Sequence, residues 1–486
     1  STPTPISTRT ATATPTRTPA ATATPTPAVP ATPTPIAGGE VITVPVGAHV
    51  EGGGGTLWRS DLYLTNSDGI PVDVRVSYQP CCGEPLVRIL TIGAHWTLLF
   101  EDVVSDLFGA GDGRGPLRIE TLAGGAQVPA VVSRTFAATT LGNIGQEIPA
   151  VAHPRAGVFY LTGLRNDVDF RSNVAVTATP ESDVTATFVL YRGSDGRVHG
   201  SVQKVVAAGQ QAQWPIAELF PGAPRPGVPM TVQVWLSNPG VTYASVVDNI
   251  SSDAVTHIGV QTSRDWIVPA VARIPGAQGT FWYSDLAIAN PGESHAMVDL
   301  EYLPEGEDNS SGGIESSTLL VPANTTWTIE DVVHELFGVD DGKGVLRVRS
   351  TQHVVVASRV YTSGANGGTM GHGLQASSPD AFRPDTRVLS GVRMRGGFRT
   401  NVGVVTGEVP ALVRFRLRAE DGVQVGDTYR EVPARSMRQW NLATLFGDDL
   451  IRKPDPAGSL VVDADADVFP YLVVVDGSSQ DPVLFV

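Results

Sequence analysis

The sequence predicts an all-β protein of four tandem β-sandwich domains, preceded by an extended Thr/Pro-rich segment. Short alternating apolar segments are broken throughout by Gly, Pro, Asn and Asp, a pattern typical of strands joined by turns. One motif, an aromatic residue followed by Ser or Thr and then Asp or Asn, occurs four times. The length of 486 residues is too great for one core. The spacing of the motif selects four domains.

The first segment, residues 1–39, consists almost entirely of Thr, Pro and Ala and cannot form a core. Proline keeps such a segment extended, so about 35 residues would span on the order of 110 Å. Its composition is typical of O-glycosylated stalks, and a bare flexible spacer is the alternative. The candidate glycosylation sites are Thr10, Thr12, Thr14, Thr16, Thr24, Thr26, Thr32 and Thr34.

From residue 40 the chain alternates between two kinds of unit, A and B. The A units align through LWRSDLYLTN with FWYSDLAIAN, and through EDVVSDLFG with EDVVHELFG. The B units align through FRSNVAV with FRTNVGV, and through VVDNISSD with VVDGSSQD. A weaker match joins A to B, which indicates one domain duplicated twice. The predicted domains are A1 (residues 40–155), B1 (156–265), A2 (266–382) and B2 (383–486).

The repeated motif raises the question of a reactive serine at Ser60, between Arg59 and Asp61. A feature present four times is rarely one active site. With the two-residue period of a strand, Ser60 faces inward together with Leu62 and Leu64. The equivalent inward positions are Ser172, Ser284 and Thr400.

A short helical turn is predicted in each unit, as in FEDVVSDLFG, where acidic residues precede apolar residues at helical spacing and Gly109 ends the turn. A tryptophan lies a few residues upstream in every unit. Burial in the core is the favoured interpretation, and carbohydrate stacking is the functional alternative. These tryptophans are Trp96, Trp214, Trp327 and Trp440.

Charges on the motif strand and on a later strand exchange places between A and B units. The exchange predicts four exposed cross-strand ion pairs, each contributing about 0 to 1 kcal/mol and helping to set register. The predicted pairs are Asp61–Arg134 and Asp285–Arg359 in A units, and Arg171–Asp248 and Arg399–Asp476 in B units.

No local signature of a catalytic or cofactor site is found. The nine histidines form no metal-binding spacing, and no phosphate loop or nucleophile elbow occurs. We therefore predict no enzyme activity, catalytic residue or cofactor; a paired-carboxylate glycosidase is the enzyme alternative. Acidic loops and one acidic strand give weak calcium candidates, although Gly-Asp-Gly is more often a turn and no EF-hand pattern is present. These candidates are Asp112, Asp340, Asp341, Asp463, Asp465 and Asp467.

Two further kinds of modification site are present. Cys81 and Cys82 are adjacent in a predicted hairpin loop, where both a vicinal disulfide and two free thiols fit the sequence. Three sequons make Asn249, Asn309 and Asn324 candidate N-glycan acceptors.

Charge and composition also bear on partners and compartment. A net charge of −15 and a pI near 5.0 argue against binding to nucleic acid or anionic lipid. No apolar run approaches the roughly 18 residues needed to span a membrane. A chain that starts at Ser1 without methionine suits a secreted protein whose signal peptide has been removed. The expected location is extracellular or on the cell surface.

The Thr/Pro segment followed by four sandwich units resembles bacterial extracellular proteins with tandem Ig-like β-sandwich repeats behind a mucin-like stalk. The resemblance covers the whole chain but rests on architecture, with no diagnostic motif. It implies surface display, adhesion, or matrix and filament building. It transfers no catalytic residue.

The ends of the sandwich region lead to a hypothesis of self-assembly. The segment after residue 40 aligns with the segment that follows B1, and an apolar strand ends B2 without a successor. We therefore predict a head-to-tail filament formed by strand addition between copies. The alternatives are an adhesin array that binds carbohydrate or protein and, third, a glycan-active enzyme. The assembly candidates are Val41, Ile42, Val44, Val46, Val483, Leu484, Phe485 and Val486.

Overall fold

The computed structural model describes residues 41–486 except 53–54, 123–126, 141, 192, 194, 223–229, 313, 365, 395 and 448–457. The predicted Thr/Pro segment and its eight candidate threonines therefore lie outside the described residues. Nearly all regular structure in the described part is β-strand, which confirms the all-β prediction. The strands sort into four consecutive groups, and we keep the names A1, B1, A2 and B2 for them. Two strands begin before the predicted boundaries, β9 at Arg155 and β16 at Ser263.

The elements follow the chain in this order. A1 contains β1 (Val41–Glu51), β2 (Leu57–Thr65), β3 (Val72–Tyr78), β4 (Leu86–Ile92), β5 (Thr97–Phe100), α1 (Val103–Asp106), β6 (Gly113–Thr121), β7 (Ala130–Thr139) and β8 (Gly142–Glu147). B1 contains β9 (Arg155–Leu164), β10 (Phe170–Ala178), β11 (Val184–Tyr191), β12 (Val198–Val206), β13 (Gln211–Pro215), α2 (Ile216–Leu219), β14 (Met230–Asp248) and β15 (Ala254–Ile258). A2 contains β16 (Ser263–Pro275), β17 (Phe281–Asn290), β18 (Ala296–Pro304), β19 (Glu315–Val321), β20 (Thr325–Ile329), α3 (Val332–Phe337), β21 (Gly342–Ser363) and β22 (Thr369–Gln375). B2 contains β23 (Arg387–Val392), β24 (Phe398–Thr406), β25 (Ala411–Ala419), β26 (Gln424–Val432), β27 (Met437–Asn441), α4 (Leu442–Phe446), β28 (Gly458–Ala464), β29 (Val468–Asp476) and β30 (Pro482–Phe485).

Each group forms two antiparallel sheets with the same strand order. In B2 the sheets are separate, with orders β26-β25-β28-β23 and β27-β24-β29-β30. In B1 and A2 the long strands β14 and β21 run from one sheet into the other, and in A1 the pairing of β1 with β2 connects the sheets. The repeated order is what duplication of one domain predicts.

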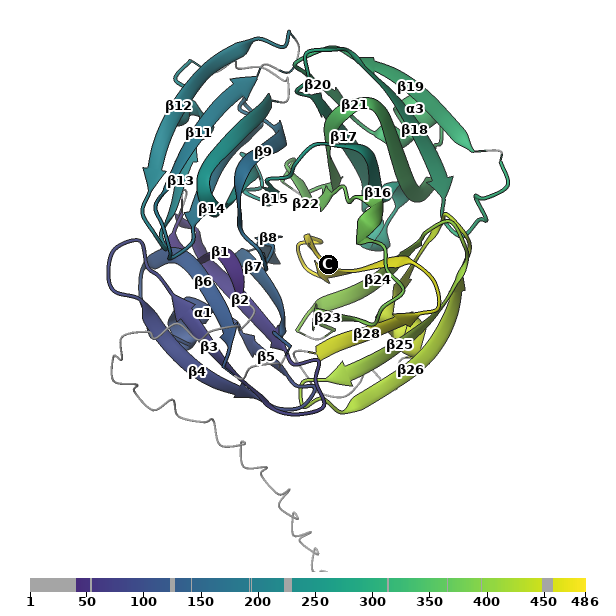
Figure 1. Cartoon of the computed structure of the whole chain (residues 1–486). Helices are drawn as coiled ribbons and strands as arrows, with labels where there is room; N and C mark the ends of the chain where they lie inside the picture. The colour runs from purple at the N-terminus through teal and green to yellow at the C-terminus, as the bar shows by residue number, and fades with distance from the viewer. Residues whose placement is uncertain are drawn as a thin grey trace, which may run out of the picture. The chain divides into compact units, whose positions relative to one another are not determined.

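The four domains lie around a common centre, and the last domain returns to the first (Figure 1). The last strand of each second sheet lies innermost. Strand β8 contacts β15 and β30, and β22 contacts the same two strands, so the four inner edge strands cover one another. Mutual covering removes the open edges that would otherwise invite pairing with another chain.

Three of the hydrophobic cores extend from one domain into a neighbouring one. The A1 core includes Ala175 and Tyr243 of B1, and the A2 core includes many B2 residues such as Tyr471. The B2 core also includes Tyr63 and Val132 of A1, whereas the B1 core, among the described residues, contains no residue of A2. We call A1 with B1 the first half, and A2 with B2 the second half. Apolar packing joins the domains within each half.

A helical turn is present in every domain, as predicted. In A1 the Asp102 side chain accepts a hydrogen bond from the Ser105 backbone N–H, which caps the turn. Val103 and Val104 are fully buried, and Gly109 leaves the turn at a φ of +65°. The turn therefore closes one end of the sandwich with apolar side chains.

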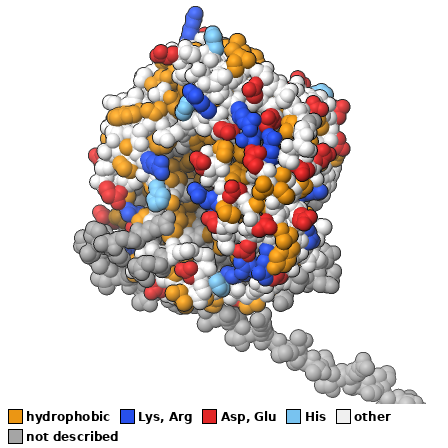
Figure 2. Space-filling model, turned by 45° about the vertical axis from the view of Figure 1, so that its right-hand side comes forward, with side chains coloured by type: hydrophobic (Ala, Val, Ile, Leu, Met, Phe, Trp, Pro, Cys, Tyr) orange, Lys and Arg blue, Asp and Glu red, His pale blue; other side chains and the backbone are white. Residues whose placement is uncertain are grey.

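The visible surface mixes acidic and basic side chains with scattered apolar ones (Figure 2). Such interspersed charge is typical of a protein exposed to water on this face. None of the helices in the described part of the chain has the length and apolarity needed to cross a membrane.

Candidate functional site

Two short turns place aspartates at the junctions between the halves. The turn after β14 begins at Asp248 and ends at Asp253, and the turn after β29 begins at Asp476 and ends at Asp481. Asp476 accepts backbone hydrogen bonds from Ser478 and Ser479 of its own turn, at 2.8 and 3.0 Å. An aspartate is favoured at the first position of the turn, because its carboxylate accepts hydrogen bonds from backbone N–H groups that the turn would otherwise leave unpaired.

The second oxygen of each of these aspartates reaches the neighbouring half. Asp248 accepts from the N–H and hydroxyl of Thr369 at 2.8 and 2.7 Å, and Asp476 accepts from the N–H and side-chain amide of Asn143 at 3.3 and 2.8 Å. Burial alone would raise the pKa of Asp248 and Asp476, but the N–H donors of their own turns, together with the donors across the junction, outweigh it and lower both values. The repeated turn is therefore a clasp between domains.

The second aspartates of the two turns meet in the interior. Asp253 accepts from the N–H of Gly371 at 2.8 Å, and Asp481 accepts from the N–H of Gly145 at 2.7 Å. Burial raises the pKa of both carboxyl groups, and each interacts with the other. Two buried carboxylates that interact cannot both ionise cheaply, so protonation of the pair is favoured.

A small hollow lies beside the inner edge strands and is lined by Glu147, His372, Gln146 and Leu484, among others. Its volume is about 20 Å³, enough for one water molecule. Enclosure by protein raises the pKa of Glu147 to about 8, and burial lowers the pKa of His372 to about 4. Both side chains are therefore neutral near pH 7. The hollow has titratable groups but no room for an organic substrate.

Loss of the clasp gives a testable change in stability. We expect Asp476→Ala to lower the free energy of unfolding by about 2 to 3 kcal/mol, because buried donors of Ser479 and Asn143 lose a charged acceptor. Urea unfolding followed by tryptophan fluorescence measures the change. Asp467→Ala, at an exposed position of the same domain, is the control. Equal stability of the two variants would contradict the assignment.

The predicted ion pairs of the A units are present in one case. Asp61 lies 3.1 Å from Arg134, which confirms the pair, but neither is exposed: their relative exposures are 0% and 5%. Burial raises the pKa of Asp61 to about 6 although Arg134 and Arg393 oppose the shift. The second face of the sheet is covered by other domains, which a single-domain pattern does not reveal.

The second predicted pair, Asp285 with Arg359, is confirmed in register only. The two residues lie opposite one another on β17 and β21. The Arg359 guanidinium instead donates to the hydroxyl of Thr369 at 2.7 Å, while Asp285 accepts from the N–H of Asp331 at 3.0 Å.

The B-unit pairs Arg171–Asp248 and Arg399–Asp476 are wrong. Arg171 lies opposite Val247 and Arg399 opposite Val475, so each aspartate is one position out of register and points to the other face. Arg171 donates to Asn249 at 2.7 Å, and Arg399 donates to Gln480 at 2.8 Å.

The repeated serine position is structural. Ser60, Ser172, Ser284 and Thr400 are all buried, as predicted. Ser60 accepts from the N–H of Ala48 at 2.9 Å, and Ser284 accepts from that of Ala272 at 2.8 Å. In the B units the donors are the N–H groups of Arg165 and Arg393, at 2.9 and 3.0 Å. Each hydroxyl satisfies a backbone group of the preceding strand segment.

The predicted burial of the four tryptophans is wrong for the A domains. Trp96 and Trp327 are 44% and 41% exposed. Trp96 directly precedes the edge strand β5, and Trp327 lies on the edge strand β20, so both are at the rim of a sheet. Trp214 and Trp440 are half-buried and contact Phe188 and Phe415 edge-on. The carbohydrate-stacking alternative therefore keeps two accessible candidates.

The calcium candidates are dispersed. Asp112 and Asp341 are exposed, and Asp340 lies 3.1 Å from His334. Asp463 pairs with Arg416 at 2.6 Å, Asp465 accepts from the N–H of Leu412, and Asp467 is exposed. Among the described residues no three His, Cys, Asp or Glu side chains converge as metal ligands.

Cys81 and Cys82 are exposed, and both thiols are free. Burial and the neighbouring Cys82 raise the pKa of Cys81. We expect two thiols per folded chain to react with a thiol reagent such as DTNB, with Cys81 the slower. Thiols that react only after reduction would show that the vicinal disulfide forms instead. Intact mass before and after reduction distinguishes the two states.

The three sequons differ in accessibility. Asn249 is exposed, and Asn324 is half-buried in a turn with a φ of +57°. Asn309 is only 5% exposed, and its side-chain nitrogen donates to the carbonyl oxygens of Pro304, Glu307 and Arg435. A glycan on that nitrogen would displace these hydrogen bonds, so the structure argues against Asn309 as a glycosylation site.

The assembly candidates are already paired inside the chain. Val44 and Val46 are buried on β1, which pairs with β6 and β2, and Val41 and Ile42 of that strand are half-buried. Val483, Leu484 and Phe485 are buried on β30, which pairs with β29, and Val486 is exposed. Phe485 also contacts Tyr63 of A1, with ring centroids 6.2 Å apart. The premise that these ends are unpaired is wrong.

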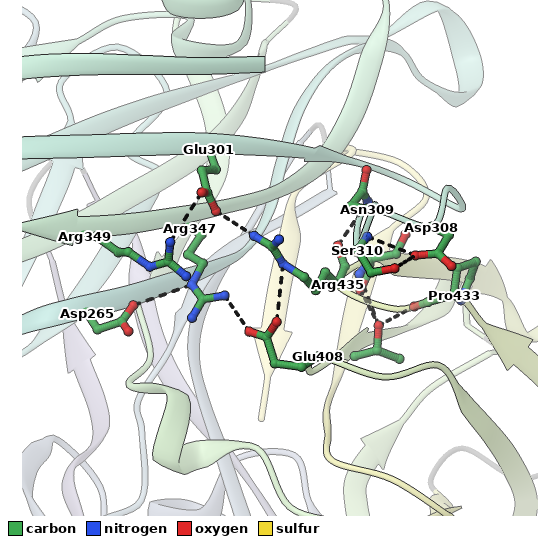
Figure 3. Close-up of polar contacts among 12 residues, drawn as sticks. Asp265, Glu301, Asp308, Asn309, Ser310, Arg347, Arg349, Glu408, Pro433 and Arg435 are labelled. Atoms are coloured by element: carbon green, nitrogen blue, oxygen red, sulfur yellow. Dashed lines mark hydrogen bonds and ion pairs between the residues drawn. The ribbon is translucent and has the colours of Figure 1, made fainter. Parts of the chain in front are cut away.

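A charged network joins A2 to B2 (Figure 3). Arg347 contacts Glu408 at 2.6 Å, and Arg435 contacts Glu301 at 2.7 Å. Arg435 adopts a φ of +49°, whereas Gly209 occupies the equivalent turn of B1 at +73°. The turns before Trp96 and Trp327 likewise hold His95 and Asn324 in the left-handed region, so this turn adopts the conformation with residues other than glycine. The network continues through Arg349 and Asp265.

The comparisons with known proteins are sparse. No protein-family model matches the chain, and no curated protein matches it significantly. A solved structure of a tetra-tandem repeat in the extending region of a large adhesion protein is 14% identical, covering 92% of this chain and 98% of that one, with a TM-score of 0.11. Native E. coli alpha-2-macroglobulin is 10% identical, covering 88% of this chain and 28% of that one, with a TM-score of 0.12. At these TM-scores neither likeness carries an argument.

Proposed function

We propose that this chain is a non-enzymatic extracellular structural or adhesion protein, in which four β-sandwich domains form one rigid body for surface display. The supporting observation is the closed centre: four inner edge strands cover one another and leave a hollow for about one water molecule. Buried carboxyls are present there, but they hold domains together. The secreted location follows from the composition of residues 1–39.

Surface attachment and turnover test this proposal. Beads coated with the purified chain should be retained on cells or matrix under flow, compared with beads coated with an unrelated β-sandwich protein. The same preparation should release no product from a panel of polysaccharides. Sustained hydrolysis would contradict the non-enzymatic assignment, and equal retention of both bead types would contradict adhesion.

The exposed tryptophans favour carbohydrate as a second candidate function. Trp96 and Trp327 are accessible in both A domains, and flat aromatic faces bind sugar rings by stacking. On a glycan array, the double variant Trp96→Ala/Trp327→Ala should lose any signal. Trp235→Ala, which removes another exposed tryptophan at 43%, is the matched control.

A further inference from the structure

The ring contains two junctions between its halves, and they are built from the same contacts. Gly371 of A2 donates to Asp253 of B1 at 2.8 Å, as Gly145 of A1 donates to Asp481 of B2 at 2.7 Å. Ser251 and Ser479 each donate through the side chain to a backbone oxygen across the junction.

A second set of contacts repeats in the same way. The N–H of Thr326 donates to the backbone oxygen of Gly193 at 2.9 Å, and the N–H of Thr97 donates to that of Glu420 at 3.0 Å. Each junction therefore joins the B domain of one half to the A domain of the other through the same contacts.

Only one of the two junctions is also joined by the chain. The first half ends with β15 at Ile258, and the second begins with β16 at Ser263. The connection is residues 259–262, in which Val260 exchanges two backbone hydrogen bonds with Tyr160. Fully extended, four residues span about 14 Å. The junction between A1 and B2 holds without any covalent connection.

The halves are also the natural units of exchange. Within each half the domains share an apolar core, and the B1 core, among the described residues, contains no A2 residue, whereas the B2 core includes Tyr63 and Val132 of A1. The A1–B2 junction carries charge, with the buried Asp61 3.5 Å from Arg393 and the exposed Glu101 2.6 Å from the same guanidinium. An opened chain would leave this charge and the clasps without partners, a large cost.

We propose that a second copy of this chain is a binding partner through exchange of halves, so that residues 41–258 of each copy close on residues 263–485 of the other. Both junctions re-form with the same contacts, and only the path of residues 259–262 changes. Because the exchange is reciprocal it closes on a dimer, in contrast to a head-to-tail filament. At low protein concentration each half binds the other half of its own chain, because the effective concentration of that half is higher than the concentration of a second copy.

A disulfide across the A1–B2 junction tests the proposal. The hydroxyl oxygens of Thr65 and Ser390 lie 2.7 Å apart. The full chain carrying Thr65→Cys/Ser390→Cys with Cys81→Ser/Cys82→Ser is refolded at low and at high concentration, oxidised, and analysed by light scattering and non-reducing electrophoresis. We expect monomers with an intrachain disulfide at low concentration, and a dimer fraction linked by interchain disulfides that rises with concentration.

Two results would overturn the exchange. The first is refolding to monomers alone at every concentration. The second is a dimer that separates into monomers on non-reducing gels, because its disulfides would then lie within each chain. The same chain with a Gly/Ser insertion after Gln261 is the control, because a longer connection relieves the constraint and should lower the dimer fraction several-fold. The Cys-to-Ser chain without the new cysteines shows whether the disulfide itself drives dimerisation.

Discussion

We expect Arg134→Met to lower the free energy of unfolding by about 3 kcal/mol. Asp61 is fully buried and would lose its 3.1 Å partner, keeping only Arg393 at 3.5 Å. The Arg134 guanidinium also lies over the rings of Phe136 and Phe398, at 4.4 and 5.3 Å. Urea unfolding at pH 7 measures the loss.

Arg171→Met is the matched control for this variant, because it also removes an arginine from the inner sheets but breaks only an exposed contact to Asn249. Its effect should stay within about 1 kcal/mol. Adding Asp61→Asn to Arg134→Met should recover part of the loss, because the amide carries no buried charge. No recovery would show that packing, and not the charge, explains the effect.

The second large effect is on pH dependence. The pKa of Glu147 is about 8 in the folded chain, above its ordinary value of 4.5, so between these values folding retains a proton that the unfolded chain loses. The stabilisation is complete below pH 4.5 and is lost as the pH rises to about 8. Between pH 6.5 and 8 the loss is about 2 kcal/mol. We expect Glu147→Gln to abolish that part.

The range above pH 6.5 separates Glu147 from the buried histidines. Burial lowers the pKa of His257 and His372 from 6.5 to about 4, so their stabilisation is present above pH 6.5 and is lost as the pH falls. Urea midpoints at pH 6.5 and 8 therefore report the carboxyls. Glu335→Gln, at an exposed site in α3, should behave like the unmodified chain. An unchanged slope in Glu147→Gln would contradict the assignment.

The features set by local periodicity are those the sequence predicts well. The two-residue period places Ser60 and its three equivalents inward, and the helical spacing after Asp102 predicts a turn. Both depend only on neighbours within one domain. The all-β class follows from the same short-range patterns.

The features that depend on other domains could not be predicted in this way. Asp61 was expected at the surface because its strand face is covered only when B2 returns to A1. Asp253 and Asp481 lie far apart in sequence and interact only in the closed ring, and the hollow lined by Glu147 also takes residues from the other domains. One signal was available: both B units carry a pair of aspartates five residues apart, Asp253 ending the first pair. Because both B units keep this pair of aspartates and the predicted arginine partners do not bind them, the pair indicates a contact with another domain.

The return of the last domain to the first has a mechanical consequence. Tension applied through β1 and β30 acts on A1 and B2, which touch each other without a covalent connection. The contacts between them are non-covalent, so parting of this junction would separate A1 from B2 and leave the hydrogen bonds within each sheet intact. The protein would lengthen under load while every domain stayed folded, and the clasps at Asp476 and Asp481 would let it recoil when the load ended.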